Sequence, residues 1–130
     1  MSKPFSLAAL IPPFLAGLLI AGLPWWTAPY NRFHLLRPLP LAACAGFLLL
    51  ALFLGYVQRP LWILRVLALA GGVPAAVLAR VVVDTMKDPT SHNLWPFEVV
   101  LAGILAVALA VPGALLGWGL GWLARRGNAT

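Results

Sequence analysis

The chain has 130 residues, of which 62% are hydrophobic and only 9% are charged. A soluble domain carries about 25% charged residues, so this composition excludes an ordinary water-soluble fold and indicates an integral membrane protein. The net charge is +6, but the basic residues stand at the ends of apolar runs rather than on one polar face. There they suit anionic lipid headgroups, and we expect no nucleic-acid partner.

Four apolar runs divide the chain, at residues 6–23, 41–57, 61–86 and 96–124. A helix needs about 20 apolar residues to cross a bilayer, and each run approaches or exceeds that length. We therefore predict an all-α membrane protein in which residues 1–130 form a single integral membrane domain. The expected architecture is a four-transmembrane-helix up-down bundle with short loops.

The first run begins with Ser6, which is a suitable helix N-cap, and contains the pair Pro12-Pro13. In a bilayer we expect these prolines to kink the helix rather than end it. A cleaved signal peptide is the alternative interpretation. The run is long for such a peptide and no Ala-x-Ala cleavage site follows, so we expect a retained helix.

The second and third runs are joined by the short segment Gln58-Arg59-Pro60, which predicts an antiparallel helical hairpin. Gly72 and Pro74 near the middle of the third run predict a kink and close backbone packing. The fourth run begins at Pro96, a residue well suited to the first turn of a helix, and contains Pro112.

Basic residues determine the expected orientation. With the N-terminus in the cytoplasm, the cytoplasmic side carries Lys3, Arg59, Arg65, Arg125 and Arg126, and the outer side carries Arg32, Arg37, Arg80 and Lys87. This small excess predicts that both termini are cytoplasmic, and we expect a bacterial inner-membrane protein. In that orientation the first and third loops face outward.

All three carboxylates fall between Asp84 and Glu98, and the rest of the chain has none. Acidic groups are costly in hydrocarbon, so this segment marks a place where the protein meets water. Much of it has a structural interpretation. Asp88-Pro89 predicts the end of the third helix, Glu98 suits the positive end of the fourth, and Arg80 and Asp84 form an interfacial pair with a snorkelling arginine.

The functional interpretation is that polar side chains converge on the outward face. The candidate site comprises Asp84, Asp88, His92, Glu98, His34 and Arg80. These residue types suit a proton-accepting cluster or a divalent metal. Their spacing matches no metal motif, so we predict no cofactor and keep a divalent metal as the alternative. We assign no catalytic residue.

Small residues recur every four positions in the fourth run, a pattern that lets helices approach closely. The helix-packing candidates are Gly113, Gly117, Gly121, Ala106, Ala110 and Gly72. Packing inside the bundle is the expected use of this row. Docking onto another integral membrane protein, or onto a second copy of this chain, is the alternative.

No acid or base is expected at the middle of the membrane, which argues against a buried proton relay. The sequence therefore favours a non-catalytic accessory, assembly or stabilising subunit of a larger membrane complex over an enzyme. Its partners would be the lipid bilayer and another membrane protein or a copy of itself. The alternative is a small transporter or membrane enzyme with an outward polar site around Asp84, Asp88, His92 and Glu98.

Overall fold

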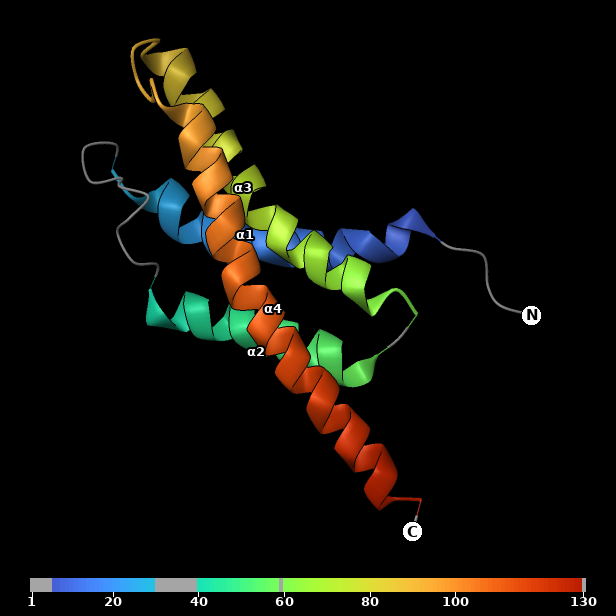
Figure 1. Ribbon diagram of the computed structural model, residues 1–130. Helices are drawn as coiled ribbons and strands as arrows, with labels where there is room; N and C mark the ends of the chain where they lie inside the picture. Colours follow the sequence, from blue (N-terminus) through green and yellow to red (C-terminus); the bar gives the residue numbers. More distant parts are fainter. Residues whose placement is uncertain (1–5, 30–39, 59, 130) are drawn as a thin grey trace.

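The computed structural model describes residues 6–29, 40–58 and 60–129, and within these ranges every regular element is a helix. Four α-helices follow a short 3-10 helix (η1, Leu7–Leu10) in the described part of the chain (Figure 1). They are α1 (Ile11–Thr27), α2 (Leu41–Val57), α3 (Trp62–Lys87) and α4 (Trp95–Gly127). The all-α prediction is confirmed.

Three helical segments are long and apolar enough to cross a membrane: Leu7–Thr27, Trp62–Lys87 and Trp95–Gly127. These lengths and compositions fit an integral membrane protein. The remaining helix, α2, is shorter, with 17 residues. The predicted bundle of four spans is therefore not confirmed.

The prolines near the start of α1 do not end the helix, as predicted. Pro12 and Pro13 occupy the first turn of the α-helix directly after the 3-10 helix η1, and the helical segment Leu7–Thr27 continues through them. A proline in the first turn loses no intrahelical hydrogen bond, since the N–H groups there have no partner within the helix. Pro24, Pro74 and Pro112 are the prolines that lie inside helices.

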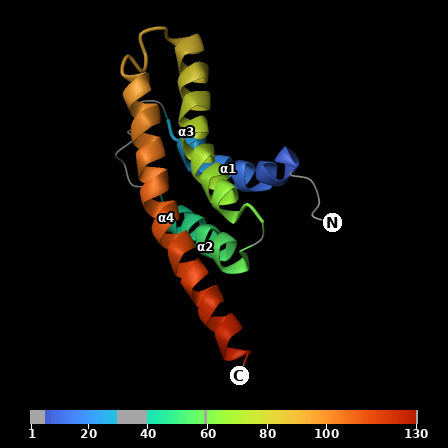
Figure 2. The same ribbon diagram turned by 45° about the vertical axis from the view of Figure 1, so that its right-hand side comes forward.

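α3 and α4 form an antiparallel hairpin, and α1 and α2 lie across it rather than alongside it in both ribbon views (Figures 1 and 2). α1 packs mainly on α3, and α2 packs mainly on α4. The arrangement thus differs from a bundle of four nearly parallel helices. It consists of two crossed pairs joined through α3 and α4.

Glycines make these crossings close. A Cβ atom added to Gly17 of α1 would lie 2.0 Å from the Leu69 carbonyl oxygen of α3. A Cβ atom added to Gly117 of α4 would lie 1.9 Å from the Leu52 carbonyl oxygen of α2. At both crossings the backbones are in direct contact, a separation that only glycine permits.

The small residues singled out in the sequence lie in the interior of the fold. Those on α4 are buried, as is the one on α3; they are Ala106, Ala110, Gly113, Gly117, Gly121 and Gly72. The α4 row is in contact with α2 around Gly113, Gly117 and Gly121. This row is consequently not exposed for docking of a second protein.

We predict opposite effects for two alanine substitutions on α4. Gly117→Ala should lower the free energy of unfolding by about 1–3 kcal/mol, because the methyl group collides with the α2 backbone. Gly119→Ala is the matched control, since a Cβ there meets nothing within 4 Å; it should be neutral or stabilise by up to about 1 kcal/mol. Steric trapping in bicelles measures both values, and equal effects would contradict the crossing.

Candidate functional site

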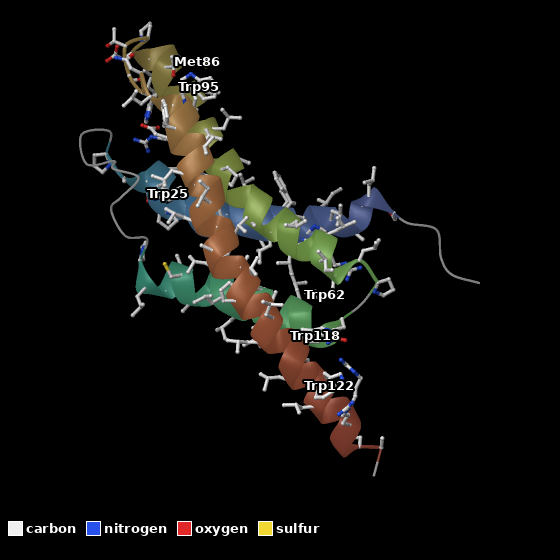
Figure 3. All side chains as sticks on the ribbon, in the orientation of Figure 1. Trp25, Trp62, Met86, Trp95, Trp118 and Trp122 are labelled. Carbon is white, nitrogen blue, oxygen red and sulfur yellow. The ribbon has the colours of Figure 1, made fainter. Side chains whose placement is uncertain are left out.

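Polar side chains gather at the end of the molecule where α3 finishes and α4 begins. Met86 and Trp95 mark this end in Figure 3, and Trp62, Trp118 and Trp122 lie toward the opposite end. Asp88 adopts an extended backbone at the end of α3, as expected for a residue before proline. The chain then turns and enters α4, which has a proline in its first turn.

An ion pair within α3 forms the centre of this region. The Arg80 Nε atom donates to Asp84 Oδ2 at 2.6 Å, and both residues are only 7% exposed. The four-residue spacing places both side chains on one helix face, as expected. Arg80 nevertheless turns inward, so the interpretation of a snorkelling arginine is wrong. The reason is a set of acceptors in α1.

Arg80 joins the C-terminal end of α1 to α3. Its Nη1 atom donates to the carbonyl oxygens of Trp25 at 2.7 Å and Trp26 at 3.2 Å. The last carbonyls of a helix lack intrahelical partners, so a guanidinium group there satisfies them and interacts favourably with the helix dipole. A second bond supports the same contact, because the Trp26 indole donates to the Ala76 carbonyl oxygen at 3.0 Å.

His92 connects this pair to α4. Its Nε2 atom lies 2.9 Å from Asp84 Oδ2, and its Nδ1 atom lies 2.8 Å from Glu98 Oε2. The side chain is 4% exposed, and the backbone has a left-handed φ of 53°. Histidine adopts this conformation more readily than β-branched residues do. The left-handed turn therefore places the imidazole between two carboxylates.

We call these four residues, Arg80, Asp84, His92 and Glu98, the tetrad. A ring nitrogen donates a hydrogen bond only when it carries a hydrogen, so His92 donates to both carboxylates when its imidazole is protonated. In that state the two cations and two anions sum to zero charge. Mutual neutralisation of this kind is what makes buried charges tolerable.

The geometry gives no support to a metal centre. No group of three His, Cys, Asp or Glu side chains in the described residues is arranged to hold a metal ion. The two nitrogens of His92 face different carboxylates, and a ligand set would need donors that face one point. His34, the remaining candidate ligand, lies outside the described residues.

Asp88 stands apart from the tetrad and organises the turn. It is exposed, and its Oδ1 atom accepts hydrogen bonds from the Thr90 hydroxyl at 2.7 Å and from the Thr90 backbone N–H at 3.0 Å. The Ser91 backbone N–H donates to the Asp88 carbonyl oxygen at 3.0 Å. These bonds shape the segment that leads to His92.

A cavity of about 670 Å³ opens beside the tetrad, between the end of α1 and the last turns of α3. Arg80 and Asp84 form part of its wall, with Trp26 from α1 and Lys87 and Asp88 from the end of α3. The sequence predicted neither this cavity nor the two carbonyl groups of α1 that accept hydrogen bonds from Arg80. A backbone carbonyl at a helix end has no residue-specific signal in a sequence.

Comparisons of the chain with protein-family models, curated protein sequences and solved structures gave no match. Its function is therefore inferred from the geometry of the tetrad and the cavity. Four of the six candidate residues form the tetrad, and a fifth, Asp88, lies in the adjoining turn.

Removing one charge from the tetrad should be strongly destabilising. We predict that Asp84→Asn lowers the free energy of unfolding by about 3–5 kcal/mol, because Arg80 remains buried without its counter-ion. The matched control is Asp88→Asn, which keeps an acceptor for Thr90 at an exposed position and should leave the free energy of unfolding nearly unchanged. Unfolding measured in the same bicelles tests both; similar losses would contradict the tetrad's role.

The hydrogen bonds of the turn should be detectable through the pKa of Asp88. The Thr90 hydroxyl and backbone N–H bonds hold the pKa of Asp88 below its ordinary value. A depressed carboxylate pKa means that these bonds stabilise the fold above the unfolded-state pKa and are lost as the pH falls through the folded-state pKa. Thr90→Val should raise the pKa of Asp88 toward its ordinary value, as measured by carboxyl NMR titration.

Thr85→Val is the control for this titration, since the Thr85 hydroxyl donates to the Val81 carbonyl oxygen within α3. It should leave the pKa of Asp88 where it is in the unmodified protein. An Asp88 titration that is unchanged by Thr90→Val would contradict the assigned hydrogen bonds.

Proposed function

We propose that this chain is a four-span protein of the bacterial inner membrane, with both termini in the cytoplasm. Its proposed role is that of a non-catalytic accessory, assembly or stabilising subunit of a larger membrane complex. The other integral membrane protein in that complex, or a second copy of this chain, is its proposed partner alongside the lipid bilayer.

The length and surroundings of α2 support a fourth span. Residues 41–57 contain no charged side chain, and at 1.5 Å per residue the helix is about 26 Å long. A hydrocarbon core of about 30 Å adapts to such a small mismatch by local thinning. Contacts between α2 and α4 leave only part of the α2 surface for lipid.

Helix directions also support an alternating path through the membrane. Gly17 lies next to Leu69, and Trp26 further along α1 lies next to Ala76 further along α3, so these two helices run in the same direction. In a chain whose spans alternate in direction, the first and third spans must run in the same direction. α2 and α4 are related in the same way through their glycine contacts.

Basic and aromatic residues at the C-terminal end of α4 support the proposed orientation. Arg125 and Arg126 lie in its last turn, and the Arg126 guanidinium lies 3.8 Å from the centre of the Trp122 ring. A tryptophan with an adjacent arginine is typical of a membrane interface. Placing this end in the cytoplasm puts the tetrad on the outer side.

One observation carries the non-catalytic role: the tetrad's charged groups bind one another and the end of α1. Both ring nitrogens of His92 face carboxylates, and Arg80 holds two carbonyl oxygens as well as Asp84. A general base or metal ligand needs a nitrogen directed toward substrate or metal. The arrangement instead ties together α1, α3 and α4.

The second candidate function is a small transporter or membrane enzyme that uses Asp84, Asp88, His92 and Glu98. The observation that favours it is the cavity, whose wall includes both Asp84 and Asp88. In this case the carboxylates would hold a cationic substrate while His92 exchanges a proton.

Native extraction tests the accessory role. We expect a tagged chain, expressed at its natural level and extracted in a mild detergent, to purify in fixed stoichiometry with another membrane protein or as a defined oligomer. In the hetero-complex case, deleting the chain should lower the partner's abundance without changing its transcript. A lone monomer with no dependent protein would contradict the proposal.

Two variants separate the candidate functions. Asp84→Asn should lower the abundance of the chain and of its complex together, whereas Asp88→Asn should leave both unchanged. A transporter or enzyme would instead lose its cellular phenotype in both variants while Asp88→Asn retains normal abundance. That second pattern would favour the alternative.

A further inference from the structure

The cavity beside the tetrad lies where α3 extends further than α1. α1 ends at Thr27, at the level where Arg80 holds its last carbonyls, and α3 continues to Lys87. The final two turns of α3 therefore extend past α1, and the cavity lies beside them. Its described walls include the side chains of Trp26, Ala79, Val83, Asp84 and Lys87.

Asp84 presents an acceptor with no partner of its own. The side chain is 9% exposed, and its Oδ2 atom accepts from Arg80 Nε and lies 2.9 Å from His92 Nε2. Its Oδ1 atom has no hydrogen-bond partner among the described residues, and the residue lines the cavity. Among the described residues, the buried side-chain atoms that lack a partner are Arg65 Nε and Ser91 Oγ, so Asp84 Oδ1 is open to solvent and can accept a hydrogen bond from a ligand in the cavity. The cavity therefore suits a ligand with an N–H donor.

Two charged side chains at the opening of the cavity indicate a second chemical group on the ligand. Lys87 and Asp88 are both exposed and lie one turn of α3 beyond Asp84. Lys87 forms no ion pair with any residue in the described ranges, so its ammonium group is available for an anion such as phosphate. One helical turn rises about 5.4 Å, which the two-carbon linker of an ethanolamine phosphate ester can cover.

The apolar part of the wall points to a lipid as the source of this headgroup. Val83 is 48% exposed and Ala79 is also exposed, so the cavity continues into an apolar surface of α3. Such a surface accommodates an acyl chain below the headgroup level. Free phosphoethanolamine has no acyl group that could contact this surface.

We propose that this cavity binds one phospholipid with a primary-ammonium headgroup, of the phosphatidylethanolamine class. The ammonium group donates to Asp84 Oδ1, the phosphate pairs with Lys87, and an acyl chain runs over Ala79 and Val83. The proposal is independent of the accessory role, because a bound lipid requires no protein partner.

Native mass spectrometry of the purified full-length chain tests this site. After delipidation, the chain is exposed in turn to phosphatidylethanolamine, phosphatidylcholine and phosphatidylglycerol of identical acyl composition. We expect one phosphatidylethanolamine to be retained about tenfold more tightly than either other lipid. The choline headgroup has no N–H, and the glycerol headgroup has no ammonium. Equal retention of all three would overturn the proposal.

Two tryptophan variants supply a test that leaves the charges intact. Val83→Trp fills the cavity and should lower phosphatidylethanolamine retention about tenfold. Val82→Trp, at the next residue, is equally apolar and 52% exposed but does not line this cavity, so retention should be unchanged. Unchanged binding in Val83→Trp would overturn the site.

A competition experiment with free phosphoethanolamine distinguishes binding of the whole lipid from binding of its headgroup alone. Free phosphoethanolamine should displace the bound lipid only weakly, because it lacks the acyl chain that contacts Val83. Binding of the free headgroup as tightly as that of the lipid would overturn the assignment to a phospholipid.

Discussion

The Oδ2 atom of Asp84 accepts a hydrogen bond from Arg80 on the same helix and lies 2.9 Å from His92 Nε2 in the turn that leads to α4. Arg80 extends the contact to the end of α1, and His92 extends it to Glu98 at the start of α4. Each link satisfies a group that is expensive to bury: a guanidinium, a carboxylate or a helix-end carbonyl. Together these contacts hold α1, α3 and α4 at this end of the molecule.

Close backbone contacts at glycines hold the rest of the fold. Near the middle of the molecule the helices touch through backbone atoms at Gly17 and Gly117, where no side chain fits. In lipid there is little hydrophobic gain from helix association, so close van der Waals contact of this kind contributes most. The charged tetrad fixes one end, and the glycine crossings fix the remainder. The cavity lies where α3 extends beyond Thr27, the last residue of α1.

Much of this could be read from the sequence, since hydropathy predicted where all four helices lie and the four-residue spacing predicted the pair Arg80–Asp84. The steep crossings could not be predicted, because α1 contains two glycines, Gly17 and Gly22, and nothing in the sequence aligns Gly17 with Leu69. The burial of Arg80 was also missed. It depends on carbonyl groups of α1 that come from a segment about 55 residues away, and backbone acceptors have no sequence signature.

A double-mutant cycle between Asp84 and His92 measures the central interaction most directly. Asp84→Asn and His92→Asn are made singly and together, and asparagine at position 92 tolerates the left-handed backbone. The free energy of unfolding in bicelles should show a coupling of about 0.5–3 kcal/mol, since each change removes the same contact. Additive losses, within about 0.5 kcal/mol, would contradict the account in which this contact joins α3 to α4.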